Sequence, residues 1–234
     1  MFHGLFQRLF DALPSQCLVC HGWPTQPVCE ACVTRFAQPQ SRCQTCALPL
    51  PANLRQCGAC VKNPPPLDAC LAAVPYAFPW SDLIVGYKFH NNPGRASALG
   101  LLLRSTPWVE PALDAADFVL PMPLSLKRLQ TRGFNQALLL ARQLAPGKTA
   151  PRLLLRIKDT PPQSSLKRAE RLDSVKDAFA VEPLLQHQIK GARLVLVDDV
   201  MTSGASLYAA ARTLRAAGAA HITGLVIART DMDH

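Results

Sequence analysis

The chain has 234 residues, of which 49% are apolar, enough to fill one sizeable core and a smaller one. No apolar run approaches the roughly 20 residues of a membrane-spanning helix, and the amino-terminal segment lacks a signal-peptide pattern, so we expect no transmembrane segment and a cytoplasmic location. The formal net charge of +9 permits an anionic ligand, phosphate or nucleic acid, but many proteins of such charge bind neither.

The cysteines divide the chain into two parts. All nine lie between residues 17 and 70, and none follows. The segment KNPPPLDA at 62–69 contains three consecutive prolines, which cannot continue a helix. We therefore predict a cysteine-rich module over residues 1–66 and a second domain over 67–234. Within the first part, the segment 2–13 predicts a short helix whose apolar face is typical of a docking surface.

Eight cysteines form four Cys-x-x-Cys pairs, separated by 8, 10 and 10 residues. Two intervening residues let both sulfurs of a pair face one tetrahedral ion, so four pairs predict two structural Zn²⁺ sites. A disulfide framework needs an oxidising compartment, and a redox pair normally occurs once, within a thioredoxin-like pattern. Grouping consecutive pairs closes shorter loops than interleaving them, but the spacing leaves both open. The predicted ligands are Cys17, Cys20, Cys29, Cys32, Cys43, Cys46, Cys57 and Cys60.

The cysteine-rich module contains few large apolar residues, so we expect metal to hold it together. Such ribbons bind nucleic acid, bind protein or brace a neighbouring domain, and the sequence leaves these roles open. Cys70 has no place in the paired pattern and is expected to be a small buried apolar residue. His21, beside Cys20, is expected at the surface rather than as a ligand.

The second part alternates between strand-like and helix-like segments. This alternation predicts an α/β fold with a mostly parallel sheet flanked by helices, in which ligands bind beyond the carboxyl ends of the strands. The predicted strands are 71–78, 117–123, 192–200 and 221–228, and the predicted helices are 80–89, 95–105, 135–145 and 205–218.

The segment 194–206, LVLVDDVMTSGAS, carries the clearest chemical pattern. Its four apolar residues predict a central strand covered on both faces, with Asp198 and Asp199 at the carboxyl end. The turn that follows leads into a helix N-terminus, where free N–H groups and the hydroxyls of Thr202, Ser203 and Ser206 suit a phosphate. The carboxylates need hydroxyl donors or a cation. The pattern therefore predicts a sugar phosphate, with or without Mg²⁺.

This segment resembles the fingerprint of type I phosphoribosyltransferases, whose ligand is 5-phosphoribosyl 1-pyrophosphate (PRPP). Further segments resemble motifs of the ComF family: YKFH at 87–90, PMPLSLKRLQTRGFNQALLLA at 121–141 and QSSLKRAERLDSVKDAF at 163–179. The four cysteine pairs resemble the double zinc ribbon of that family. The resemblance thus covers nearly the whole chain, with Ser174 as a departure where the family usually has asparagine.

The resemblance implies a type I phosphoribosyltransferase-like domain with a small N-terminal zinc-ribbon domain. It implies that Asp198 and Asp199 hold the ribose hydroxyls and that the turn binds the 5-phosphate. Loss of pyrophosphate from the ribose C1 then needs Mg²⁺ and protein cations but no covalent protein nucleophile. The turn residues are Thr202, Ser203, Gly204, Ala205 and Ser206; the cations are Lys88, Lys127, Arg128 and Arg132; and Asn135 and Gln136 cap the next helix or contact the ligand.

Alternatives stay open for the basic residues and for the function. A solvated basic helix also explains Arg128 and Arg132. A second basic segment has two equally good explanations: an ordinary exposed helix, or a segment that closes over the site and excludes water. Its residues are Arg156, Gln163, Lys167, Arg168 and Arg171. One function is a Mg²⁺-dependent phosphoribosyltransferase of unidentified acceptor. The alternative is a non-catalytic protein that binds single-stranded DNA or senses PRPP, because the resemblance implies a role in natural competence, with single-stranded DNA and a helicase-like protein as partners. An aromatic content of 6% disfavours a base-stacking platform.

Overall fold

The computed structural model describes residues 15–23, 25–89, 92–159, 175 and 177–231. The chain divides into two compact units, Met1–Gln38 and Pro39–His234. The helix predicted at 2–13 lies outside the described residues, as do Gln163, Lys167, Arg168, Arg171 and Ser174. No helix in the described part of the chain is both long and apolar enough to cross a bilayer.

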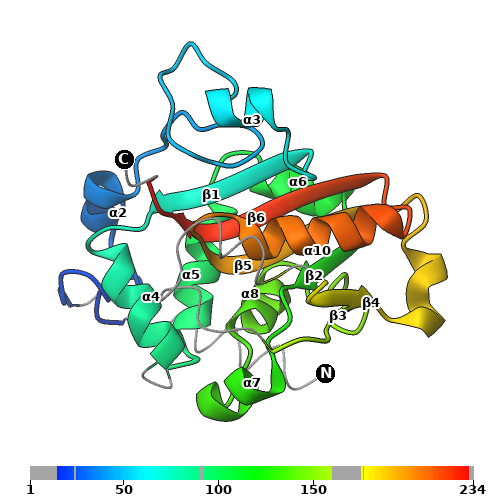
Figure 1. The fold of residues 1–234 in the computed structure, drawn as a ribbon. Helices are drawn as coiled ribbons and strands as arrows, with labels where there is room; N and C mark the ends of the chain where they lie inside the picture. The colour runs from blue at the N-terminus through cyan, green and yellow to red at the C-terminus, as the bar shows by residue number, and fades with distance from the viewer. Residues whose placement is uncertain (1–14, 24, 90–91, 160–174, 176, 232–234) are drawn as a thin grey trace. The chain divides into compact units, whose positions relative to one another are not determined.

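A four-stranded parallel sheet forms the centre of the larger unit (Figure 1). Its strands follow the order β1-β6-β5-β2. The four apolar residues at 194–197 are buried in β5, which pairs with β6 on one side and β2 on the other. This confirms the predicted parallel sheet. The strands are β1 (Ala69–Pro75), β2 (Phe118–Pro121), β5 (Arg193–Met201) and β6 (His221–Arg229).

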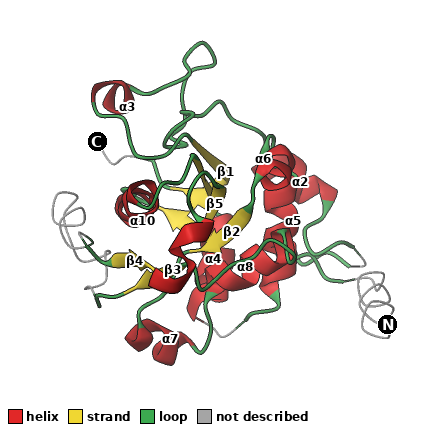
Figure 2. Cartoon of the chain, turned by 90° about the vertical axis from the view of Figure 1, so that its right-hand side faces the viewer, coloured by secondary structure: helices red, strands yellow, loops and turns green. Residues whose placement is uncertain are grey.

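Helices cover both faces of this sheet, as predicted. Helix α10 (Ala205–Ala216) lies on one face, and α5 (Arg95–Arg104), α6 (Val109–Ala115) and α8 (Gln136–Leu144) lie on the other (Figure 2). Leu207, Ala210, Ala211 and Leu214 of α10 are all buried, at the spacing that places apolar side chains on one helical face. The remaining helices are α4 (Trp80–Phe89) and α7 (Leu126–Arg132).

A few short elements were not predicted. Strands β3 (Leu154–Arg156) and β4 (Phe179–Val181) form an antiparallel pair separate from the main sheet. Helix α6 and the 3₁₀ helix η2 (Pro183–Gln188) were also missed. These elements have between three and seven residues, too few for hydrophobic periodicity to identify them.

The division between the compact units falls between the two predicted cysteine groups. The smaller unit contains α2 (Glu30–Phe36), and the larger contains α3 (Gly58–Lys62). Within the larger unit, Cys43, Cys46 and Cys60 belong to the same buried core as Cys70 and Met201. The predicted module boundary at residue 66 therefore lies inside the larger unit. Burial of Cys70, which is 3% exposed, agrees with its predicted role as a small core residue.

Candidate functional site

The carboxylate of Asp199, near the carboxyl end of β5, interacts with three groups from different elements. Lys88 Nζ lies 2.8 Å from Asp199 Oδ1, and Gln136 Nε2 donates to Asp199 Oδ2 at 2.9 Å. The N–H of Val200 donates to Oδ1 at 2.6 Å. Because Lys88 lies in the last turn of α4 and Gln136 begins α8, one carboxylate that is 5% exposed joins a strand to two helices.

Asp198 has different surroundings from its neighbour. Its Oδ1 accepts the N–H of Asp199 at 2.9 Å, and the residue is half-buried rather than buried. Burial raises the pKa of Asp198 to about 7, and the charge of Asp199 adds to this rise, while Lys88 and Arg132 partly offset it. The carboxyl group therefore changes charge near neutral pH, and a bound cation would favour its ionised form.

The turn after β5 requires glycine at position 204. Gly204 has a φ of +80°, and a Cβ there would lie 2.6 Å from Met201 Cε and from Tyr208 Cζ. From Gly204 the chain enters α10, a helix of 12 residues whose first-turn N–H groups lack intrahelical acceptors. Thr202, Ser203 and Ser206 are half-buried around this N-terminus. The turn thus offers backbone and hydroxyl donors suited to an anion.

Arginines interact electrostatically with the two carboxylates and with one another. Burial lowers the pKa of Arg132, with Arg128 lowering it further and Asp199 and Asp198 acting in the opposite direction. Burial and the charge of Arg128 likewise lower the pKa of Arg156, against Asp159 and Asp198. Arg132 and Arg156 therefore lie close enough to the carboxylates to interact with them electrostatically, and Arg128 lies near both arginines. Lys127 is exposed on α7, and the roles predicted for these cations stay predictions.

Asn135 and Gln136 hold the start of α8. Asn135 Oδ1 accepts the N–H of Leu138 at 3.1 Å as the N-cap, and its Nδ2 donates to the Met122 carbonyl at 3.1 Å. The Tyr87 hydroxyl donates to the Gln136 carbonyl at 2.8 Å. Capping was one of the two roles predicted for these residues. Their direct contact with a ligand stays a prediction.

Aromatic side chains beside the site were missed by sequence reasoning. Arg132 Cζ lies 5.0 Å from the ring centroid of Phe89, a residue that is 62% exposed, and Arg156 Cζ lies 5.4 Å from that of Phe179. An aromatic residue next to Lys88 was the one available signal, within the YKFH segment. Its pairing with an arginine of α7 depends on the fold and has no local signature.

The eight paired cysteines form two groups of four, with the sulfurs of each group within 4.8 Å of one another. The measured Sγ–Sγ distances of 3.8 Å for Cys17–Cys32 and 3.7 Å for Cys46–Cys57 suit one metal ion. A Zn–S distance of about 2.3 Å places tetrahedral sulfurs roughly 3.8 Å apart, whereas a disulfide needs about 2.0 Å. The donor set fits Zn²⁺, the grouping is consecutive rather than interleaved, and the groups are Cys17, Cys20, Cys29 and Cys32, and Cys43, Cys46, Cys57 and Cys60.

The two groups repeat one local design. In the first, the N–H of Cys29 donates to Cys17 Sγ at 3.4 Å, and in the second the N–H of Cys57 donates to Cys43 Sγ at 3.4 Å. In each, the third cysteine is the N-cap of a short helix. Such N–H donors stabilise thiolates, the form that binds metal.

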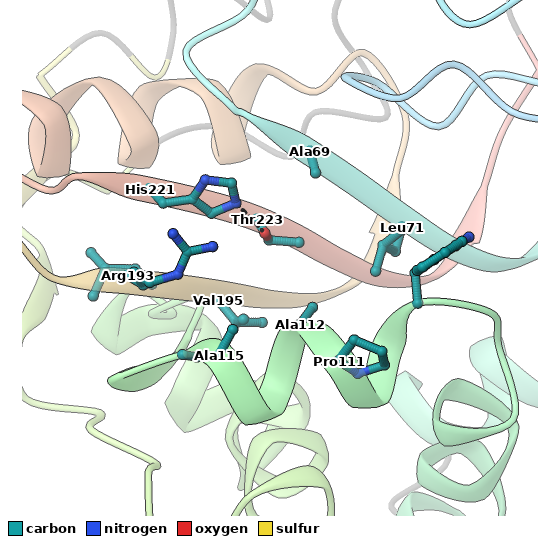
Figure 3. Close-up of a pocket in the computed structure, with 12 residues that line it drawn as sticks. Ala69, Leu71, Pro111, Ala112, Ala115, Arg193, Val195, His221 and Thr223 are labelled. Carbon is teal, nitrogen blue, oxygen red and sulfur yellow. Dashed lines mark hydrogen bonds between the residues drawn. The ribbon is translucent and has the colours of Figure 1, made fainter.

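A separate cavity of about 220 Å³ lies at the opposite end of the sheet (Figure 3). It opens between α6 and the amino ends of β1, β5 and β6, with Arg193, His221 and Thr223 among its lining residues. Five residues of extended strand separate Arg193 from Asp198, a span of roughly 17 Å. The cavity is therefore distinct from the site around the two carboxylates.

Comparison with known proteins agrees with this geometry. Residues 129–231 match the phosphoribosyl transferase domain family. The DNA utilization protein YhgH of Salmonella typhimurium is 31% identical over 87% of this chain and 90% of its own. Competence protein F of Haemophilus influenzae is 31% identical to this chain, and the match covers 80% of this chain and 84% of that protein. Competence protein ComFC of Bacillus subtilis is 38% identical, and the match covers 48% of this chain and 45% of that protein. The solved structure of an allosteric regulatory enzyme of purine biosynthesis also matches, with a TM-score of 0.39 and 18% sequence identity. The match covers 61% of this chain and 30% of that enzyme's chain, and it is too distant to support an argument.

The parallel sheet and the strand, turn and helix at its centre define a phosphoribosyltransferase-like domain. With the cysteine groups and these relatives, the chain belongs to the ComF family.

The cysteine geometry predicts two zinc ions per chain. Mass-spectrometric metal analysis of the purified protein should give a ratio near two, and Cys60→Ser should lower it to about one, because three thiolates hold Zn²⁺ less well than four. Cys70→Ala, at a buried cysteine outside both groups, should keep the ratio near two. An unchanged zinc content in Cys60→Ser would contradict the assignment of the second group.

Proposed function

We propose that this protein binds PRPP at the carboxyl end of β5. The observation that carries the proposal is the combination of two carboxylates, a turn with glycine in the left-handed region and the N-terminus of a 12-residue helix. The N–H groups and hydroxyls of Thr202–Ser206 bind the 5-phosphate, while Asp198 and Asp199 hold the ribose hydroxyls. Both ends of the ligand then have groups of suitable charge.

The cations of the site serve the pyrophosphate. Lys88, Arg128 and Arg132 lie on the α4 and α7 side of the carboxylates, and Arg156 adds a fourth positive charge. Mg²⁺ bound with PRPP supplies further charge neutralisation as pyrophosphate leaves the ribose. The fixed guanidinium groups stabilise the negative charge that develops on that leaving group. We propose transfer of the phosphoribosyl group as the activity of this site.

A role in the use of external DNA forms the second part of the proposal. Two of the relatives are named competence proteins and one a DNA utilization protein. Around the site, Phe89 is 62% exposed beneath Arg132, and Leu126 on α7 is 78% exposed. An exposed ring beside several cations suits a stacked base and its phosphates. We propose single-stranded DNA as a ligand of this surface, with a helicase-like protein as partner on the cytoplasmic side.

PRPP binding is tested by calorimetric titration of the zinc-loaded protein, with and without Mg²⁺. We expect binding that Asp198→Asn weakens about tenfold or more, because the neutral amide is a poorer acceptor for ribose hydroxyls and a poor Mg²⁺ ligand. The double variant Asp198→Asn, Asp199→Asn should lose binding.

Asp114→Asn on α6 is the matched control, since it removes an exposed carboxylate outside the site and should bind as the unmodified protein does. If the unmodified protein shows no binding of PRPP with or without Mg²⁺, the site is not functional. If it binds, release of pyrophosphate in the presence of candidate acceptors tests the transfer step.

The raised pKa of Asp198 predicts pH-dependent binding. The carboxyl group is largely protonated at pH 6 and largely ionised at pH 8, because its pKa is about 7. Affinity for PRPP with Mg²⁺ should therefore rise by up to about tenfold between these pH values. In Asp198→Asn, PRPP affinity should keep only the pH dependence that comes from the ligand itself. If affinity changes with pH equally in this variant and in the unmodified protein, Asp198 does not titrate in this range.

DNA binding is tested by fluorescence anisotropy with a labelled single-stranded oligonucleotide. We expect affinity that falls steeply with added salt and that Phe89→Ala weakens about tenfold by removing a stacking surface. Trp108→Ala serves as the control, because Trp108 is 74% exposed but lies against the separate cavity. No detectable binding at low salt would remove direct DNA binding from the proposal.

A further inference from the structure

Arg229, at the end of β6, connects the second cysteine group to the phosphate-binding turn. The residue is 2% exposed. Its Nε donates to the Cys46 carbonyl at 2.9 Å, and its Nη1 donates to the Met201 carbonyl at 3.0 Å and also to the Thr202 carbonyl. One buried guanidinium thus bridges a predicted metal ligand and the first residues of the turn.

The charge of Arg229 lacks a carboxylate partner. No Asp or Glu among the described residues lies within ion-pair distance of its guanidinium. Its acceptors in the described part of the chain are uncharged: four carbonyl oxygens, including that of Thr230 at 2.7 Å, and the Thr230 hydroxyl at 3.4 Å. A buried cation without a counter-charge is costly. Four thiolates around one Zn²⁺ carry a net charge of about −2. The metal-loaded second group, which includes Cys46, therefore supplies the missing negative charge.

Packing joins the same two regions independently of Arg229. Cys70 Sγ lies 3.6 Å from Met201 Sδ, and the N–H of Cys70 donates to the Gln44 carbonyl at 2.7 Å. Cys46 and Met201 belong to one buried core, against which Tyr208 of α10 packs. A displacement of the Cys43–Ala47 loop is therefore transmitted to the residues that begin the turn.

We propose that Arg229 is a positioning residue that couples metal binding at the second cysteine group to phosphate binding at the Thr202–Ser206 turn. Metal fixes the Cys46 carbonyl and balances the charge of Arg229, and Arg229 in turn fixes the carbonyls of Met201 and Thr202. Their orientation sets the direction of the N–H groups that follow. The inference rests on the proposed function, because it assigns regulation to the PRPP site.

Coupling between two binding sites is reciprocal, so the ligand must also tighten the metal. The test uses the unmodified zinc-loaded protein titrated with a colorimetric zinc chelator, with and without ribose 5-phosphate, whose binding is measured in parallel by calorimetry. We expect ribose 5-phosphate to raise the affinity of one of the two zinc ions about tenfold and to leave the other unchanged.

Variants then assign the coupling to Arg229. Arg229→Met should remove most of the effect of ribose 5-phosphate on zinc affinity, leaving at most the share carried by the Cys70–Met201 contact, and Arg229→Lys, which keeps the charge, should keep more of the effect than Arg229→Met does. Arg212→Met, at an exposed arginine of α10, is the matched control and should retain the full effect. Cys60→Ser should weaken ribose 5-phosphate binding, whereas Cys32→Ser, in the smaller unit, should not.

The outcomes separate this inference from the proposed function. If ribose 5-phosphate binds but changes the affinity of neither zinc ion, the coupling is overturned and the binding site stands. Equal weakening of ligand binding by Cys60→Ser and Cys32→Ser would also overturn it, because the effect would then come from general loss of folding. If ribose 5-phosphate and PRPP both fail to bind the zinc-loaded protein, the proposed function and the coupling are overturned together.

Discussion

The ion pair between Asp199 and Lys88 is the interaction on which the arrangement of the site depends. It joins β5 to α4 at 2.8 Å, and Gln136 adds the start of α8 to the same carboxylate. A buried pair of this kind adds little net stability, because desolvation of both charges opposes their attraction. Its effect is on geometry: a carboxylate that accepts from a strand and two helices fixes the direction of each. Lys88 of α4 is thereby held near the end of β5.

The two adjacent carboxylates differ because side chains alternate across a strand. Leu194 and Leu196, which share the face of Asp198, pack into the core that includes α10, so Asp198 lies on the side where that helix begins. Asp199 faces the opposite helices and is used to hold them. Two residues of the same type thus differ in their surroundings: Asp199 bonds to α4 and α8, whereas the pKa of Asp198 is raised to about 7, which in our proposal lets its charge respond to a ligand.

Sequence reasoning succeeded where a local pattern carries the information. The helix predicted at 80–89 coincides with α4, and the segment 194–206 carries its whole geometry in its own residues: an apolar strand, an acidic pair and a glycine turn. It could not show that Asp199 pairs with Lys88, since those residues are distant in the chain and only the fold unites them. The grouping of the cysteines was likewise open, because the spacings between the pairs fit either arrangement until the sulfur positions are known. Arg229 carried no signal at all, being one arginine at the end of an apolar strand.

The charge of the second cysteine group is consistent with its position inside the larger unit, in the same core as the phosphoribosyltransferase-like domain. The formal net charge of +9 counts every thiol as neutral, and each metal-loaded group of four thiolates lowers it by about two. Part of that negative charge lies inside the larger unit, next to the buried guanidinium of Arg229, whose acceptors in the described part of the chain are uncharged carbonyl and hydroxyl oxygens. In our proposal the half-buried cations near Asp198 meet the anionic ligand, while the metal group balances the charge of the buried Arg229. Cys43, Cys46 and Cys60 belong to the buried core of the larger unit, so the cysteine-rich segment over 43–60 is part of that unit's own core. If the proposed coupling holds, the metal of this group also keeps that interior electrically balanced.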